Sequence, residues 1–175
     1  MRYILRRHEL TVDEWRAPDE ASEAPADAPL IVPLAALRAD PGRWQGRRSR
    51  LGVRLAPAEG VEELAAYLPA LSLVAVEFPN PGDGRGYSQA RLLRERLGFR
   101  GELRAVGAGV RQDQLFLMTR CGFDAFELAP GEDPEAARRA FARYDVAYQS
   151  GSPLLELRRQ RFPRSGSCYR PHRPP

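Results

Sequence analysis

Short apolar stretches alternate with longer amphipathic stretches from residue 30 onward. The apolar stretches predict strands, and the alternation of bulky residues over 123–128 predicts a further strand. These predicted strands cover residues 30–32, 51–56, 73–78, 103–106 and 123–128. Residues 73–78 are apolar on both faces, which is typical of a parallel strand covered by helices.

Helical periodicity fills the intervals between the predicted strands, and Asp133 with Pro134 is a suitable start for the last helix. The predicted helices cover residues 33–44 with an interruption near Pro41, 61–68, 89–97, 115–121 and 134–143. Five β-α units in succession predict an α/β fold with a mostly parallel sheet flanked by helices. We expect a doubly wound sheet, with a partial barrel as the alternative, because the repeated β-α pattern does not reveal whether the chain reverses direction in the sheet. Five strands are too few for a closed eight-stranded barrel.

The sequence divides into three parts. Residues 1–29 contain an expected edge strand at Tyr3–Leu5 and then an acidic segment rich in Pro and Ala, whose composition predicts a mobile loop or linker. Residues 30–150 form the single α/β domain, since 175 residues suit one domain of ordinary size. Residues 151–175 form a basic tail that we expect to be disordered.

The net charge of +4 lies entirely in the tail. All 27 basic residues are Arg, and residues 154–175 contain six of them against Glu156 alone, so the remainder is close to neutral. The sequence therefore does not favour nucleic acid as a partner of the domain, although the Arg-rich tail could bind RNA or an acidic surface as an alternative. No apolar run is long enough to span a membrane and no secretory signal is evident, so we expect a cytoplasmic protein.

Cysteine and histidine are scarce. Cys121 and Cys168 are too far apart in sequence for a paired metal motif, and His8 and His172 are the two histidines. The sequence contains no recognisable motif for a cofactor, and we expect neither a metal nor a cofactor. Cys121 lies in the last turn of a predicted helix and is expected to be a buried, unreactive thiol.

Ligand sites of parallel α/β sheets lie beyond the carboxyl ends of the strands. Four predicted loops lie there: 57–60, 79–88, 107–112 and 129–133. The loop 79–88 is the most unusual, because it combines closely spaced glycines with an arginine directly before a predicted helix. Glycines leave backbone N–H groups uncovered, and a helix start favours an anion.

This loop gives a candidate site for an oxyanion or another ligand. Its residues are Asp83, Gly84, Arg85, Gly86, Tyr87 and Ser88. The Arg85 guanidinium could bind an anion through two N–H groups, and the hydroxyl groups of Tyr87 and Ser88 add donors. The alternative is a tight turn in which Ser88 is an ordinary N-cap. Gly107 and Arg111 follow the next strand and extend the candidate site.

Two further possibilities remain open at these loops. Asp113 and Gln114 either belong to the extended site or simply cap the helix that follows. Glu77 and Glu127 lie near the ends of two predicted strands and could act as a pair of carboxylates in acid-base chemistry, but ordinary ion pairs with nearby arginines are the favoured interpretation.

Several strings resemble an uncharacterised bacterial family labelled "oxidoreductase probably involved in sulfite reduction". They are Asp83–Ser88, Ala90–Arg94, Gly101–Gly107, Asp113–Phe116, Arg120–Phe126 and Val146–Gln149. The resemblance covers about residues 30–149. It implies a place in assimilatory sulfite and sulfate reduction, with sulfite reductase or phosphoadenylyl-sulfate reductase as partners.

The resemblance implies a pathway more than a reaction. We therefore expect an accessory or partner protein of this pathway, which binds an oxyanion or a protein at the Asp83–Ser88 loop. A redox enzyme with a borrowed cofactor is the alternative, and whether the protein catalyses a reaction stays open, as does its oligomeric state. At the second loop, Ala108 stands where the family carries a polar residue, so the loop differs from the family's pattern there.

Overall fold

Seven strands form one sheet in the computed structural model, which describes residues 3–6, 9–16, 28–45 and 50–142. Five of the strands are parallel and lie side by side in the order of the chain. They are β3 (Leu30–Pro33), β4 (Leu51–Leu55), β5 (Leu73–Glu77), β6 (Glu102–Val106) and β7 (Ala125–Phe126). The hairpin of β1 (Tyr3–Arg6) and β2 (Glu9–Val12) extends the sheet beyond β7, with β1 antiparallel to β7.

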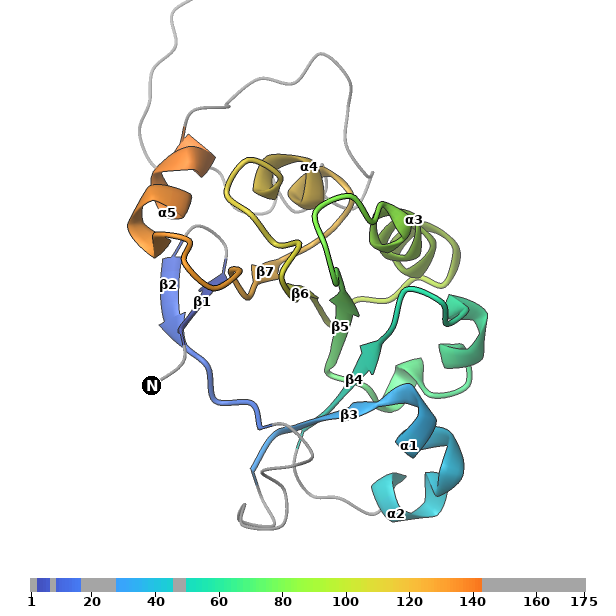
Figure 1. Cartoon of the computed structure of the whole chain (residues 1–175). Helices are drawn as coiled ribbons and strands as arrows, with labels where there is room; N and C mark the ends of the chain where they lie inside the picture. The colour runs from blue at the N-terminus through green and yellow to red at the C-terminus, as the bar shows by residue number, and fades with distance from the viewer. Residues whose placement is uncertain (1–2, 7–8, 17–27, 46–49, 143–175) are drawn as a thin grey trace, which may run out of the picture.

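The α/β class and the mostly parallel sheet are confirmed, but the doubly wound arrangement is not what forms. Doubly wound sheets require the strand order to reverse, whereas β3 to β7 follow one another without a reversal. Since β-α-β crossovers are right-handed, this order places the helices on one side of the sheet. Figure 1 shows the result: a curved, open sheet with the helices outside the arc, which corresponds to the partial-barrel alternative.

The helices lie close to the predicted segments, except that the helix after β5 begins before the predicted start at residue 89. They are α1 (Leu34–Ala39), α2 (Pro41–Gln45), α3 (Arg85–Arg91) continued by η4 (Leu92–Arg96), α4 (Leu115–Arg120) and α5 (Pro134–Ala142). The predicted helix over 61–68 is instead two short 3-10 turns, η2 (Val61–Leu64) and η3 (Leu68–Ala70). Pro69 has no N–H and its ring crowds the preceding turn, so no α-helix continues through residue 69.

The main core lies between the outer face of the sheet and the helices. Val53, Val74 and Leu103 point into it from three adjacent strands and are fully buried. Phe78 and Phe123 continue this core with their rings in edge contact, 5.7 Å between centroids. Successive side chains of a strand point to opposite faces of the sheet, so every second residue of each strand faces the helices and the others face the inside of the arc.

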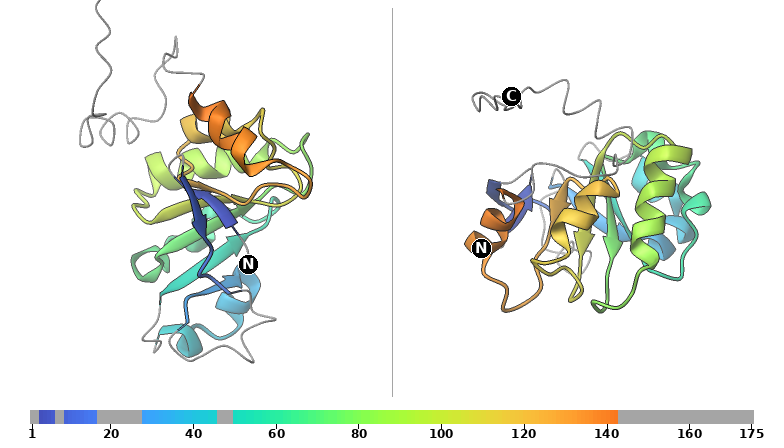
Figure 2. Two further views of the ribbon diagram at one scale, coloured as in Figure 1. Left: turned by 90° about the vertical axis from the view of Figure 1, so that its left-hand side faces the viewer. Right: turned by 90° about the horizontal axis from the view of Figure 1, so that it is seen from above.

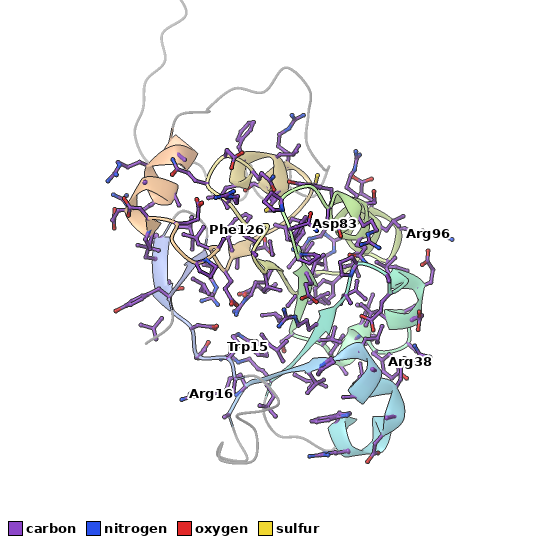
Figure 3. The ribbon with its side chains drawn as sticks, viewed as in Figure 1. Trp15, Arg16, Arg38, Asp83, Arg96 and Phe126 are labelled. Atoms are coloured by element: carbon purple, nitrogen blue, oxygen red, sulfur yellow. The ribbon has the colours of Figure 1, made fainter. Side chains whose placement is uncertain are left out.

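The N-terminal residues cover the inner face of the sheet. Trp15 is almost fully buried against Ile31, Leu73, Ala75 and Val106, and it points to the inside of the arc in Figure 3. The composition of the segment 9–29 predicted a loop or linker. Its described part instead forms β2 and then a strap, residues 13–16, that crosses the inner face.

The strap ends at the opposite edge of the sheet from β2. There Arg16 bridges to Leu30, and the Ile31 N–H donates to the Arg16 carbonyl oxygen at 2.9 Å. Residues 17–27 and the predicted basic tail lie outside the described residues. Within the described ranges, no helix is both long enough and apolar enough to cross a membrane.

Candidate functional site

The loop after β5 is closed by hydrogen bonds of its own. The Asn80 side-chain oxygen accepts the Gly82 N–H at 3.0 Å, and the Asn80 carbonyl oxygen accepts the Asp83 N–H at 3.2 Å. The Arg85 N–H donates to the Asp83 carboxylate at 3.2 Å. Three of the backbone donors that the sequence offered to an anion are therefore already bound within the loop.

Asp83 and Arg85 form a bidentate ion pair. Arg85 Nε donates to Asp83 Oδ1 at 3.0 Å and Nη2 to Oδ2 at 2.7 Å. The Arg85 side chain is 61% exposed, whereas that of Asp83 is only 8% exposed. The guanidinium hydrogen bond, with the backbone N–H second, lowers the pKa of Asp83, and the same contact raises the pKa of Arg85. The carboxylate therefore stays ionised beneath an outward-facing guanidinium.

None of the three glycines of this loop has a positive φ, and only Gly86 is required by close packing. Gly84 precedes the first residue of α3 with φ −85°, and neither Gly82 nor Gly86 has a positive φ. A Cβ on Gly86 would lie 2.5 Å from the Phe78 ring, so the missing side chain allows α3 to pack on that ring. Because α3 begins at Arg85, the expectation that Ser88 is its N-cap is wrong: Ser88 lies inside the helix and is exposed.

Tyr87 joins the first loop to the second. Its ring makes an edge contact with Phe78, and its hydroxyl donates to Gln114 Oε1 at 3.1 Å. Gln114 Nε2 in turn donates to the Pro81 carbonyl oxygen at 3.0 Å. Burial is the main cause of the raised pKa of Tyr87, so the phenol remains protonated as a donor.

The loop after β6 packs closely against the loop after β5 at two glycines, Gly107 and Gly109. Gly107 has φ +106°, and a Cβ there would lie 2.5 Å from the Phe78 carbonyl oxygen. That oxygen accepts the Gly109 N–H at 2.8 Å. A side chain at position 107 would therefore separate the two loops, and the positive φ of Gly107 also favours glycine.

Arg111 joins the second loop to the loop after β7. Its Nε donates to Glu132 Oε1 at 3.3 Å, and the Gln112 N–H donates to Glu132 Oε2 at 2.9 Å. The three consecutive loops therefore form one continuous structure, which we call the rim: residues 79–88, 107–114 and 129–133. The loops follow β5, β6 and β7 at the same edge of the sheet, the lower edge in the right-hand view of Figure 2.

The rim contains all the residues predicted for the candidate site. The structure brings Gly107 and Arg111 to the same edge as Asp83–Ser88, but Arg111 faces Glu132 rather than Arg85. Gln114 does not cap α4 with its side chain, which bonds to the neighbouring loop instead. This linking role of Gln114 was not predicted, because nothing local in the sequence names a partner on another loop.

The remaining loop, residues 57–60, is anchored by Gln89. This buried side chain donates from Nε2 to the carbonyl oxygens of Ala56 and Glu59, at 3.0 and 2.9 Å. Its Oε1 is buried and has no hydrogen-bond partner in the described part of the chain. The sequence indicated only that Gln89 opens a helix, so its role in fixing the loop was also missed.

Glu77 and Glu127 do not form a pair of neighbouring carboxylates. They belong to the ends of β5 and β7, which β6 separates. Glu77 instead accepts a hydrogen bond from Arg54 Nη2 at 2.9 Å, across adjacent strands on the inner face. Arg54 was not singled out in the sequence, although its place between the buried Val53 and Leu55 puts it on the inner face.

The inner face also holds a charged cluster that the sequence did not reveal. Arg104 is fully buried and donates from Nη1 to both carboxylate oxygens of Asp13, at 3.1 and 3.0 Å. Its Nε and Nη2 donate to Glu102 Oε1, and Arg6 Nε donates to Glu102 Oε2 at 2.8 Å. The four charges balance, as buried charges must if they are to be tolerated.

The free cysteine within the described ranges is Cys121, which directly follows α4. Cys121 is half-buried, and burial is the main cause of its raised pKa, with Arg91 and Arg120 acting in the opposite direction. The thiolate that a redox nucleophile needs is therefore disfavoured. No group of three metal-ligating side chains occurs within the described ranges.

These features define an open α/β protein with sequential parallel strands and a hydrogen-bonded rim of loops at the carboxyl edge. The chain belongs to the family described as a bacterial protein of unknown function, DUF934, which matches residues 52–153. That range includes β4 to α5 and therefore the entire rim. No curated protein matches the chain.

Proposed function

We propose that the protein is a cytoplasmic accessory protein of assimilatory sulfite and sulfate reduction that docks a partner protein at the rim. The pathway is supported by the resemblance of the strings around Asp83–Ser88 and Arg120–Phe126 to the family labelled for sulfite reduction. Membership of DUF934 is consistent with this proposal, and sulfite reductase and phosphoadenylyl-sulfate reductase are the candidate partners.

The observation that carries the docking proposal is the linkage of the three rim loops. Tyr87 and Gln114 join the first two loops, and Arg111 with Glu132 joins the third. Loops that are fixed before binding lose little conformational entropy when a partner binds. A rim of this kind is suited to presenting a defined surface to another protein.

A protein partner agrees with the geometry better than a free oxyanion does. The N–H groups of Gly82, Asp83 and Arg85 already have acceptors inside the loop. An oxyanion bound at Arg85 would also have to compete with the Asp83 carboxylate for the same guanidinium donors. A protein surface can bind the outer edge of the pair without breaking it.

The test is affinity capture of the tagged full chain from its host bacterium grown with sulfate as the sulfur source. We expect sulfite reductase or phosphoadenylyl-sulfate reductase to be captured, and Arg85→Glu to abolish capture. Arg96→Glu is the matched control, since Arg96 is similarly exposed, bonds a glutamate, and lies on the helical side (Figure 3).

A deletion strain provides the second measurement. It should grow slowly on sulfate and normally on cysteine if the protein serves this pathway. Absence of both enzymes from the captured material, together with unchanged growth on sulfate, would refute the proposal. A flavin or iron absorption spectrum in the purified protein would favour the redox alternative instead.

A further inference from the structure

Three exposed arginines at or near the carboxyl edge of the sheet share one arrangement. Each is paired with a carboxylate that is less exposed than the arginine itself: Arg54 with Glu77, Arg85 with Asp83, and Arg111 with Glu132. The arginine side chains are 48%, 61% and 53% exposed, whereas the carboxylates are 29%, 8% and 16% exposed. In six other ion pairs of exposed arginines within the described ranges, the carboxylate is at least 36% exposed.

The exposed side of each of these pairs is therefore cationic, although the pair itself is neutral. Arg54 uses Nη2 in its pair, Arg111 uses Nε, and Arg85 uses Nε and Nη2. None of the three pairs uses Nη1, so N–H donors remain on the outer edge of each guanidinium. The less exposed carboxylate also restrains each guanidinium before any partner arrives, with two hydrogen bonds at Arg85 and one each at Arg54 and Arg111.

From this arrangement we infer that the rim, with Arg54 beside it, binds an acidic protein surface through guanidinium–carboxylate pairs. A fixed guanidinium can form a two-point hydrogen bond with a carboxylate of a partner, at a smaller entropic cost than a mobile side chain. This inference rests on the proposal that the rim docks a protein, and it is independent of the pathway.

A nucleic acid fits this surface less well. Binding to a phosphate backbone relies on an excess of positive charge that releases counterions. Here each guanidinium has its own carboxylate, and residues 1–153 contain 21 Arg against 22 acidic residues. The surface therefore offers directional donors without a long-range positive field, which suits individual carboxylates at short range.

The experiment compares two triple variants of the full chain. The rim variant is Arg54→Gln, Arg85→Gln and Arg111→Gln. The matched control is Arg38→Gln, Arg91→Gln and Arg96→Gln, which removes the same charge from exposed arginines that bond glutamates on the helical side. Both variants keep the Arg-rich tail, so binding by the tail affects them equally.

The probe is a fluorescein-labelled polyglutamate peptide, titrated by fluorescence anisotropy at physiological salt. We expect the rim variant to bind about ten-fold more weakly and the control to change by less than about two-fold. Equal losses of polyglutamate affinity in both variants would overturn the inference. It would also be overturned if the wild-type protein bound polyuridine RNA more tightly than polyglutamate and only the rim variant weakened that RNA binding. Thermal unfolding of each variant establishes that the fold is retained.

A third variant, Arg54→Lys, Arg85→Lys and Arg111→Lys, keeps the charge but not the planar guanidinium. We expect about half of the loss in binding free energy to remain, because ammonium groups cannot form the two-point contact. Wild-type binding by this variant would contradict the role of the guanidinium. If the rim variant still captures sulfite reductase from cells, the inference fails while the proposed pathway stands. If the rim binds polyglutamate but the wild-type protein captures neither enzyme, the inference stands while the proposed pathway fails.

Discussion

The Arg94 guanidinium is buried against the carboxylate of Asp124, thirty residues further along the chain. Arg94 also donates to three backbone carbonyl oxygens, those of Phe99, Gly101 and Gly122. Asp124 in turn accepts the Leu103 N–H at 3.1 Å. One side chain thus ties the end of the α3–η4 helix to the start of β6 and to the turn after α4.

Replacement of Arg94 should strongly destabilise the fold. In Arg94→Ala, the Asp124 carboxylate and three carbonyl groups lose a buried partner, so we expect a loss of about 3–5 kcal/mol in the free energy of unfolding. Urea denaturation followed by circular dichroism measures this value. Arg96→Ala removes an exposed pair two residues away and should cost less than about 1 kcal/mol. Similar midpoints for both variants would contradict the role of Arg94.

Gly107→Ala should also destabilise the protein. Its φ of +106° is unfavourable for a side chain, and the new Cβ would lie 2.5 Å from the Phe78 carbonyl oxygen. We expect a cost of at least about 1–3 kcal/mol. Gly84→Ala is the matched control, because Gly84 has φ −85° and a Cβ added there would meet no atom within 4 Å. It should be neutral or stabilise by about 0.4–1 kcal/mol, and thermal unfolding of the two variants distinguishes these outcomes.

The sequence predicts the elements of the fold better than their arrangement. Apolar stretches locate the five parallel strands, and Asp133 with Pro134 locates the start of α5. Whether the chain order reverses in the sheet depends on contacts between elements, which periodicity does not encode. The sequence predicts the strand at Tyr3–Leu5, where β1 forms, but β1 is not at the edge of the sheet because β2 lies outside it. β2 was missed for a related reason: the buried Trp15 and Asp13 hold an acidic segment whose composition alone resembles a linker.

For the candidate site, the sequence predicts the edge of the sheet on which its residues lie but not most of their contacts. Close spacing of glycines fits both an anion loop and tight packing, and only the position of the Phe78 ring assigns Gly86 to packing. The pairing of Asp83 with Arg85, two residues apart, is local and could have been anticipated. The partners of Gln114 and Arg111 lie on other loops and could not.

The inner-face pair of Asp13 and Arg104 should contribute strongly to stability because both side chains are fully buried. Asp13→Ala leaves the guanidinium without a partner on the strap, and we expect a cost of about 3–5 kcal/mol. In a Trp44→Phe background, the fluorescence of Trp15 should shift to the red as the strap loosens. Adding Arg104→Met should recover part of the stability, since an apolar side chain needs no charged partner. No recovery in urea denaturation would indicate that Arg104 stabilises the sheet without Asp13.

Cys121 should react slowly with thiol reagents at neutral pH. Burial raises the pKa of its thiol above the ordinary 9.0, while Arg91 and Arg120 lower it by a smaller amount. We expect the rate at which the Cys168→Ser variant reacts with a disulfide reagent to be low at neutral pH and to keep rising beyond pH 9 before it levels off, and Arg91→Ala to slow the reaction further at neutral pH. Rapid modification at neutral pH would contradict this prediction and revive a redox role for Cys121.

The ion pair of Asp83 and Arg85 makes the stability of the rim depend on pH in the acid range. The Arg85 hydrogen bonds lower the pKa of Asp83 below the ordinary 3.8, so the folded loop binds a proton less readily than an unfolded chain does. The contribution of the pair to stability is therefore present above the ordinary pKa and is lost as the pH falls through the lowered pKa. Titration of the Asp83 carboxyl carbon by NMR should show this lowered value, and Arg85→Ala should return it toward 3.8. An unchanged pKa in Arg85→Ala would mean that Arg85 does not hold the carboxylate, and the exposed guanidinium would then lose the support on which docking at the rim depends.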